Sequence, residues 1–354
     1  MTAGTIDRPI ADPQSERSGA VLAVEALRVH FAAKSSRERV RAVDGVDFFV
    51  RRGETFGIIG ESGSGKSTLA RAAVCLTKPT DGRVLHGGAD PYLLSSRALR
   101  RHRRDFQMIF QDPHAALDPR MTILQSVREP LDVAGESGLA ARDRIALEML
   151  GRVGLSADIA SRYPHQISGG QKQRANIARA IVLRPTLLVC DEVVAALDVS
   201  IQAEVLNLFA GLQRDFGLTY LFITHDLGVV SHISDRIAVM YLGVFMEMGP
   251  ADAVCLRPKH PYTEALLSAE PQLAPSSRRA SGRIVLEGEI PSPIAPPSGC
   301  RFHTRCRYAE SRCAAESPAW REIEPGHWSA CHFAATLPLR GQNDRHQRNM
   351  GGNR

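Results

Sequence analysis

The stretch "GESGSGKST", residues 60–68, decides the fold of this 354-residue chain. It follows the apolar run "TFGII" and precedes the helical-looking "LARAAVCL", so a glycine-rich loop joins a strand to a helix. That order of elements, with the closing Lys-Ser pair, is the pattern of a phosphate-binding loop (P-loop). Gly60, Gly63 and Gly65 let the backbone turn its N–H groups toward phosphate oxygens. The flanking strand and helix disfavour the alternative, an ordinary glycine-rich turn.

The side chains of this loop predict the chemistry of its ligand. Lys66 would reach the β- and γ-phosphates of a nucleoside triphosphate, and Ser67 would give its hydroxyl to Mg²⁺. The N-terminus of the following helix adds partial positive charge. The other loop residues predicted to contact the nucleotide are Glu61, Ser62, Ser64 and Thr68.

A nucleoside triphosphatase also needs a carboxylate for the metal ion and a group that orients water. The run "LLVCDE", residues 187–192, is typical of a buried strand that ends in two acids. Asp191 is placed to hold Mg²⁺, and Glu192 is the candidate general base for the attacking water. Taken alone, such a strand end is more often merely solvated. Its position about 125 residues after a P-loop favours the catalytic interpretation.

Composition limits the class of protein. Charged residues make up 23% and hydrophobic residues 44% of the chain, as in soluble globular proteins. The net charge of +6 suggests contact with something anionic, such as a nucleotide, a nucleic acid or an acidic membrane face. No apolar run approaches the roughly 18 residues that cross a bilayer, and the N-terminus lacks a signal-peptide pattern. We therefore expect a cytosolic protein whose seven cysteines do not form a disulfide framework.

The order of the segments predicts an α/β fold with a second, smaller unit. Apolar runs alternate with helical segments after the P-loop, which indicates a parallel core sheet. Residues 237–249 are predicted to form a hairpin that turns at Gly243. The Pro-rich run "GEIPSPIAPPSGC" then separates two units. The predicted boundaries are a disordered segment 1–20, an ATPase domain 21–268, a small irregular C-terminal domain 269–335 and a disordered tail 336–354.

The run "ISGGQKQR" resembles the signature of the ATP-binding cassette (ABC) ATPases. The Ser-Gly-Gly-Gln turn of that signature is matched by Ser168, Gly169, Gly170 and Gln171. At a helix N-terminus these residues can approach a γ-phosphate, although alone they would be an ordinary Ser N-cap. The resemblance implies the fold of an ABC cassette. It would combine a P-loop core with a parallel sheet, an antiparallel β subdomain and a helical subdomain at about residues 112–165.

Four further positions match the same family. Gln111 in "FQDP" resembles the Q-loop glutamine, which contacts Mg²⁺ and water and connects the core to the transmembrane partner. His225 in "ITHD" resembles the switch histidine, which hydrogen-bonds the γ-phosphate. Asp198 resembles the D-loop aspartate that communicates across the dimer. Phe31 resembles the aromatic residue that stacks on adenine, with a core aromatic as the alternative.

The resemblance also implies cofactors and partners. ATP and Mg²⁺ would bind between the P-loop of one subunit and the signature of another. A second ABC ATPase subunit, identical or different, is therefore implied. Two transmembrane permease subunits would dock on the helical subdomain, with an extracytoplasmic solute-binding protein acting through them. The chain would then lie peripherally on the cytoplasmic face of the inner membrane.

Longer stretches resemble one branch of the family, the ATPases of oligopeptide and dipeptide importers. Examples are "FQDPHAALDPRMTI" and "KHPYTEALLSAEP", and the cysteine segment resembles the C-terminal extension of that branch. The implied function is ATP hydrolysis that powers the import of peptides or related small solutes. Two alternatives stay open: a non-transport ABC ATPase that acts on nucleic acid, and a catalytically weak subunit paired with an active paralogue.

The basic stripe "RALRRHRRDF", residues 97–106, bears on the nucleic-acid alternative. Its five arginines and one histidine are typical of phosphate-contacting stripes. No aromatic residues are interleaved among them, and the family has a similar basic segment here. We favour a solvated helix face that could touch an acidic membrane surface, and we expect no nucleic-acid partner.

The D-loop departs from the family pattern. Where the family usually has Glu-Pro-Thr-Ser-Ala-Leu-Asp, this chain has "EVVAALD", so Ala195 replaces a serine. The lost hydroxyl removes a hydrogen bond worth about 0.5–1.5 kcal/mol. We expect hydrolysis to persist but to be slower or unequal at the two sites, so Ala195→Ser should raise the single-turnover rate. Equal rates in the two proteins would rule out this handicap.

Four cysteines cluster near the C-terminus: Cys300, Cys306, Cys313 and Cys331. Their spacings of five, six and seventeen residues do not match the C-x₂-C pairs of common zinc sites. Four thiolates are the ligand set of a [4Fe–4S] cluster, and a metal staple would help a segment with little apolar material to fold. A metal or iron–sulfur site, reduced free thiols and disulfides all stay open. The candidate substitute ligands are His303, His327 and His332. The cysteines predicted to be buried apolar residues are Cys75, Cys190 and Cys255.

Overall fold

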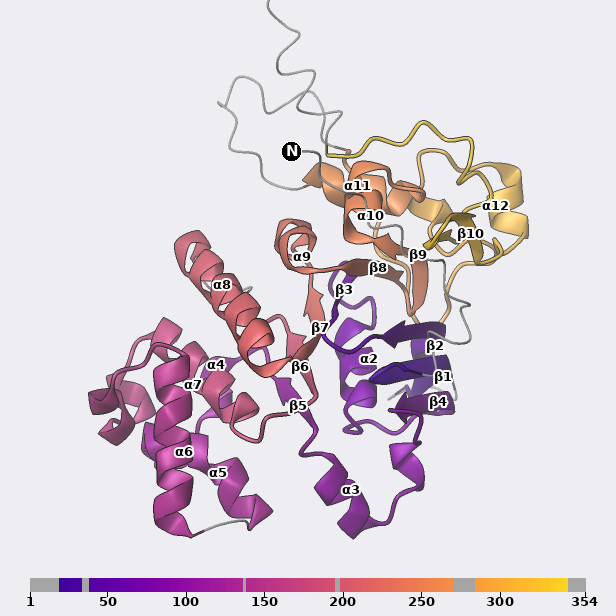
Figure 1. Cartoon of the computed structure of the whole chain (residues 1–354). Helices are drawn as coiled ribbons and strands as arrows, with labels where there is room; N and C mark the ends of the chain where they lie inside the picture. Colours follow the sequence, from indigo (N-terminus) through magenta and orange to yellow (C-terminus); the bar gives the residue numbers. More distant parts are fainter. Residues whose placement is uncertain (1–18, 34–37, 136–137, 195–197, 270–283, 343–354) are drawn as a thin grey trace, which may run out of the picture.

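The structure is a computed structural model that describes residues 19–33, 38–135, 138–194, 198–269 and 284–342 (Figure 1). The disorder predicted for residues 1–18 and 343–354 concerns segments outside these described residues.

An eight-stranded sheet forms the centre of the molecule. In spatial order its strands are β10 (Arg321–Glu324), β11 (His327–Ser329), β9 (Val244–Pro250), β8 (Arg236–Tyr241), β3 (Thr55–Ile59), β7 (Thr219–Thr224), β6 (Leu187–Asp191) and β5 (Phe106–Ile109). The strands from β8 to β5 are parallel, and β3, β6 and β7 are buried at every residue. Continuous apolar runs predicted this burial, because helices cover both faces of a parallel sheet. The predicted hairpin is β8–β9, and Gly243 sits in its turn with φ of 82°.

A second, three-stranded sheet is antiparallel. Its order is β2 (Arg39–Val50), β1 (Leu22–Ala32) and β4 (Asp81–His86). Helix α2 (Lys66–Ala73) packs between the two sheets, in contact with β1 and β2 on one side and with β6 and β7 on the other. The parallel core and the antiparallel subdomain predicted from the resemblance are therefore both present.

The helices fall into three groups in Figure 1. The helical subdomain comprises α4 (Pro113–Ala116), α5 (Ile123–Ala134), α6 (Leu139–Arg152) and the 3₁₀ turns Ala157–Ser161 and Pro164–Gln166, packed on α7 (Gly169–Ile181). Around the core sheet lie α8 (Val199–Phe216), α9 (Leu227–Ile233), α10 (Ala251–Leu256) and α11 (Pro261–Ala269). Helix α3 (Ser96–His102) contacts the 3₁₀ turn at Pro91–Leu93, and in Figure 1 it lies below β4 and β5. The C-terminal region adds α12 (Ser311–Ala315) and the turn His303–Arg305. Within the described ranges no helix is both long and apolar enough to span a membrane.

The C-terminal region is joined to the core more closely than a separate irregular domain would be. Strand β11 pairs with β9 through Trp328 and Met248, so the core sheet continues into the extension. The chain then returns to α10, where the Gln342 N–H donates to the Cys255 carbonyl at 3.0 Å. Residues 336–342, the start of the predicted disordered tail, belong to the described part of the chain.

Candidate active site

The P-loop runs from the end of β3 into α2, and two of its glycines are required by close backbone contacts. A Cβ on Gly60 would lie 2.1 Å from the Met240 carbonyl oxygen, and one on Gly65 would lie 2.0 Å from that of Ala42. Gly65 also has φ of 107°, in the left-handed region. The loop is thus tightly held by β8 and β2 from behind, and its open side faces solvent at the exposed Ser62 and Gly63.

Lys66 is the first residue of α2 and is buried. Its Nζ donates to the carbonyl oxygens of Gly60 at 2.6 Å and Glu61 at 2.9 Å, and lies 3.5 Å from Ser64 Oγ. Burial lowers the pKa of Lys66, and the negative charges of Glu192, Asp191 and Glu61 partly oppose that shift. The ammonium group is held inside the loop, close to where a β- or γ-phosphate would bind.

Ser67 and Asp191 meet beside Lys66, as predicted for a Mg²⁺ site. The Ser67 hydroxyl donates to Asp191 Oδ1 at 2.9 Å. Asp191 ends β6, is 3% exposed, and has a raised pKa because burial disfavours its charged form more than the Ser67 hydrogen bond favours it. A hydroxyl and a carboxylate facing one another supply the hard oxygen ligands that Mg²⁺ prefers, so the residues fit this ion.

Glu192 follows Asp191 in the left-handed conformation, with φ of 51°. This is a strained backbone for a residue other than glycine, and it turns the chain sharply after β6. The Gln111 amide donates to Glu192 Oε2 at 2.6 Å, and His225 Nδ1 lies 3.4 Å from Glu192 Oε1. The structure therefore brings the predicted catalytic residues Glu192, His225 and Gln111 together after the carboxyl ends of β6, β7 and β5. The fourth, Lys66, begins α2 after β3.

The buried charge of Asp191 predicts a gain of stability in Asp191→Asn. Because the folded pKa is raised, the ionised carboxylate destabilises the folded state at neutral pH. The amide removes this penalty and can still accept the Ser67 hydrogen bond. Thermal unfolding without nucleotide should show a higher midpoint for the variant at neutral pH. The difference between the two midpoints should shrink as the pH falls through the pKa of Asp191 in the folded protein toward its pKa in the unfolded chain. The variant should also lose ATPase activity. A lower midpoint at neutral pH would contradict this prediction.

The signature residues lie apart from the P-loop. Ser168 caps α7, where its Oγ accepts from the Gln171 N–H at 3.3 Å and Gln171 Oε1 accepts from the Ser168 N–H at 2.9 Å. Helix α7 packs on α4, α5 and α6, whereas α2 packs on the strands (Figure 1). Gly169 at this turn is exposed. One chain therefore does not bring its own signature to its own P-loop.

Two other predicted residues flank the site. Phe31 lies at the end of β1 and is 45% exposed, so the core-aromatic alternative is wrong. Its partner in β2 is Val40, two residues before the Ala42 carbonyl that touches the P-loop. Asp198 precedes α8, is exposed, and makes no side-chain capping bond there. Ala195 lies outside the described residues.

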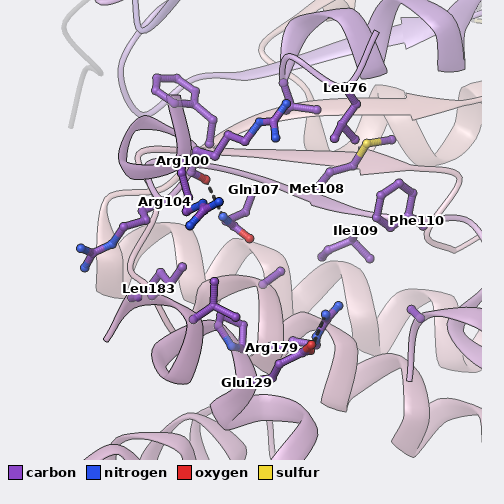
Figure 2. A pocket seen from close by; sticks show the side chains of 18 of the residues that line it. Leu76, Arg100, Arg104, Gln107, Met108, Ile109, Phe110, Glu129, Arg179 and Leu183 are labelled. Carbon is purple, nitrogen blue, oxygen red and sulfur yellow. Dashed lines mark hydrogen bonds and ion pairs between the residues drawn. The ribbon is translucent and has the colours of Figure 1, made fainter. Parts of the chain in front are cut away.

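The basic stripe forms one wall of a cavity of about 590 Å³ between the core and the helical subdomain. Figure 2 shows Arg100 and Arg104 on one side and the Glu129–Arg179 ion pair, at 2.7 Å, on the other. The apolar side chains in this groove include Leu76, Met108, Phe110, Val133 and Leu183. Of these, Leu76 is 50% and Val133 is 70% exposed. Phe110 lies directly before the Q-loop residue Gln111, so the groove adjoins the active site through the chain.

The four clustered cysteines line one small cavity beside the start of α11. Cys300, Cys313 and Cys331 are buried, Cys306 is partly buried, and all seven cysteines of the chain are free thiols. Burial raises the pKa of Cys331 to about 11 and that of Cys306 to about 12. In the described part of the chain, no group of three or more His, Cys, Asp or Glu residues is arranged to hold a metal ion.

The structure separates the histidines proposed as substitute ligands and confirms the burial of the remaining cysteines. His303 and His332 line the same cavity, but His327 is bonded to buried Glu247 at 2.7 Å and does not. The cysteines outside the cluster, Cys75, Cys190 and Cys255, are buried as predicted.

Sequence reasoning missed two residues that contact the P-loop. Tyr262 of α11 accepts a hydrogen bond from the Glu61 N–H at 2.9 Å. Arg305 of the extension forms an ion pair with the Glu61 carboxylate. No motif points to these contacts, because they join segments 201 and 244 residues apart in the chain.

The fold and the site define an ATPase of the ABC type. Residues 43–195 match the family described as ABC transporter, and residues 246–313 match the oligopeptide/dipeptide transporter C-terminal region. The oligopeptide transport ATP-binding protein AppF of Bacillus subtilis (strain 168) is 51% identical over 295 residues, covering 83% of this chain and 90% of AppF. The chain belongs to the oligopeptide/dipeptide branch of the ABC transporter ATP-binding proteins.

Solved structures support the cassette fold. The dimeric structure of MJ0796, a bacterial ABC transporter cassette, has a TM-score of 0.59 and 30% identity, covering 65% of this chain and 98% of that one. A dimeric post-hydrolysis state of MJ0796 bound to ADP and Pi has the same TM-score and 31% identity, with the same coverage.

Proposed function

We propose that this chain binds and hydrolyses ATP to power the import of peptides or related small solutes through an ABC permease. The observation that carries the proposal is the cluster of Ser67, Asp191 and Glu192 beside the buried Lys66. Gln111 and His225 both reach Glu192 in the same cluster. These groups provide, in one place, an anion-binding loop, oxygen ligands for a metal ion and a candidate base.

The residues divide the work of hydrolysis. The P-loop backbone and Lys66 hold the triphosphate, and Phe31 offers an exposed ring to the adenine. Ser67 and Asp191 would hold Mg²⁺, which when bound would supply positive charge to the phosphate oxygens. Glu192 accepts a proton from the attacking water, and Gln111 and His225 fix the direction of its carboxylate.

A second subunit completes the site. The P-loop and the signature lie on different parts of one chain, so the signature can contact the γ-phosphate only of a nucleotide held by another copy or by a paralogue. The dimers of the MJ0796 cassette are the precedent. In such a dimer, Ser168 and the glycines after it supply helix N–H groups, and Asp198 lies near the interface.

The groove of Figure 2 is the proposed docking site for a permease. Its floor exposes apolar side chains such as Val133 and Leu76, and a monomer gains by covering such surface. A groove of this kind could take the apolar face of an amphipathic helix from the permease. The arginines of the basic stripe, which form one wall of the groove, would then face lipid headgroups or acidic residues. With a permease docked in this way, the chain would lie peripherally at the cytoplasmic face of the inner membrane.

Peptide import is supported by the relatives, whose names describe oligopeptide transport, and by the shared C-terminal region. The test is reconstitution of the chain with its cognate permease and binding protein in proteoliposomes. Peptide-loaded binding protein should stimulate ATP hydrolysis and drive peptide into the vesicles. Stimulation by nucleic acid without stimulation by binding protein would favour the nucleic-acid alternative. Hydrolysis only in the presence of a paralogue would favour the catalytically weak subunit.

We further propose that the four clustered cysteines hold a [4Fe–4S] cluster. Four thiols around one largely apolar cavity match its ligand set. The ligands of such a cluster sit on four separate irons, so they need not be arranged around a single ion. Anaerobically purified protein should contain iron and sulfide and absorb visible light, and Cys313→Ser should lose both properties while Cys75→Ser keeps them. Colourless, metal-free protein with four titratable thiols in the cavity would end this proposal.

A further inference from the structure

The C-terminal extension reaches the P-loop through one buried arginine. Arg305 Nη1 donates to Glu61 Oε2 at 2.6 Å, and Nη2 donates to Oε1 at 3.0 Å. Two parallel bonds of this kind fix direction as well as distance. The Arg305 side chain is only 6% exposed, and Nη1 also lies 3.5 Å from the Tyr241 hydroxyl. The guanidinium group is therefore largely removed from solvent, while the Glu61 side chain stays 24% exposed.

Glu61 is the P-loop residue on which three parts of the molecule converge. Its N–H donates to the Tyr262 hydroxyl of α11, its carbonyl accepts from Lys66 Nζ at 2.9 Å, and its carboxylate is taken by Arg305. Arg305 thus acts on the same residue whose carbonyl orients the phosphate-binding lysine. Without Arg305, the Glu61 carboxylate would be an unpaired negative charge beside the proposed triphosphate site and a rival partner for Lys66.

A second anchor lies four residues earlier in the extension. Arg301 pairs with Asp44 of β2 and donates to the Leu242 carbonyl at 2.5 Å. Both contact points adjoin Gly243, whose N–H donates to the Ser64 carbonyl of the P-loop at 2.9 Å. Leu242 precedes Gly243 in the chain, and the Asp44 N–H donates to the Gly243 carbonyl at 2.9 Å. The segment between Cys300 and Cys306 therefore contacts the P-loop directly at Glu61, and through Arg301 it contacts two residues that adjoin Gly243.

We propose that Arg305 is a positioning residue for ATP binding, which neutralises and orients Glu61 and so makes ATP affinity depend on how the extension is seated. The proposal rests on the ATP site proposed above. It assigns the extension a part in the nucleotide cycle that differs from holding a metal cluster. It predicts an effect on nucleotide affinity more than on the chemical step.

The test compares the single variant Arg305→Met with a double variant that carries both Arg305→Met and Glu61→Gln. In the double variant both members of the ion pair are replaced by uncharged side chains. Arg305→Met should raise the Kd for Mg-ATP by about tenfold, because a charged hydrogen-bonded pair is lost. The value of kcat at saturating ATP should change less than about twofold. The double variant should recover most of the affinity, because no unpaired carboxylate remains. Arg305→Lys, which keeps the charge, should lie between the two. Arg312→Met is the matched control, since Arg312 is exposed in the same extension and its ion pair is with Glu316, four residues along the chain, at 2.9 Å.

The outcomes separate the two proposals. If the wild-type chain and the Arg312→Met control do not bind ATP, the proposed active site is wrong. If both bind ATP and Arg305→Met binds equally well, only the role of Arg305 is wrong. A loss that the second substitution does not restore would mean that Arg305 merely supports the fold. If Arg305→Met does not fold, the double variant decides: a Kd for Mg-ATP about tenfold above the wild-type value would overturn the proposal, and a Kd near the wild-type value would support it.

Discussion

Glu192→Gln is expected to lower ATP turnover by about two to four orders of magnitude while leaving ATP binding intact. The Glu192 side chain is 15% exposed, and both of its oxygens have a partner. The Gln111 amide donates to Oε2 at 2.6 Å, and His225 Nδ1 lies 3.4 Å from Oε1. A carboxylate held in this way can accept a proton from a water attacking the γ-phosphate. The amide keeps the shape of the side chain but has no basic oxygen of comparable strength. Single-turnover hydrolysis and equilibrium ATP binding, measured on the same preparations, give the two required numbers.

Glu204→Gln is the matched control for this substitution. Glu204 is 66% exposed on α8 and pairs with Arg174 at 3.0 Å, away from the P-loop. Its loss should change turnover less than about twofold, since exposed ion pairs contribute about 0–1 kcal/mol. ATP should also hold the Glu192→Gln protein in a dimer, because the substrate stays intact between the subunits. Turnover above about a tenth of the wild-type rate would show that another group activates the water.

Local motifs predicted most of the active site. The P-loop pattern depends on nine consecutive residues, and the structure places its glycines where backbone contacts exclude a Cβ. Asp191 and Glu192 were predicted from the end of a buried strand. Asp191 meets Ser67 because β6 and β3, which flank β7 in the parallel part of the sheet, end at the same edge. These predictions succeed because each depends either on residues that are consecutive in the chain or on the regular geometry of a parallel sheet.

Contacts between distant segments were not predictable from the sequence. Nothing in "CRFHTRC" indicates that Arg305 pairs with Glu61. The same sequence would also be compatible with an arginine in an exposed salt bridge or in contact with the cysteine cluster. The pairing of β11 with β9 was also missed, because three residues carry little periodicity. The left-handed backbone of Glu192 is likewise invisible in the sequence, since no glycine marks it. These features depend on how the extension and the core pack together.

The extension gives this cassette a second set of supports around its nucleotide site. In the core alone, the P-loop is bordered by Met240 of β8 and Ala42 of β2. The extension adds Arg305 at Glu61 and Arg301 at Asp44, both largely buried. A buried ion pair adds little net stability, but leaving one of its charges buried without the other destabilises the protein strongly. Such pairs therefore favour the one arrangement of the chain in which both partners meet. We therefore expect truncation before residue 300 to disturb the P-loop even where the cassette still folds.

Lys66→Met is expected to weaken ATP binding by about two orders of magnitude and to abolish measurable turnover. Lys66 is 4% exposed, and the bonds of its ammonium group to the Gly60 and Glu61 carbonyls keep this group inside the loop. Charge-assisted bonds to phosphate are worth about 1.5–3 kcal/mol each, and no other cation of the P-loop replaces them.

The stability of the nucleotide-free protein is a poor readout for Lys66→Met, because two effects oppose one another. Burial lowers the pKa of Lys66, so removing the charge relieves a cost at neutral pH, but two carbonyl groups lose their donor. The ATP-dependent shift of the unfolding midpoint is the better measurement, since it depends only on binding to the folded state. Wild-type protein and the exposed control Lys78→Met should show this shift with Mg-ATP, and Lys66→Met should not. A wild-type shift in Lys66→Met would place the triphosphate somewhere other than this loop.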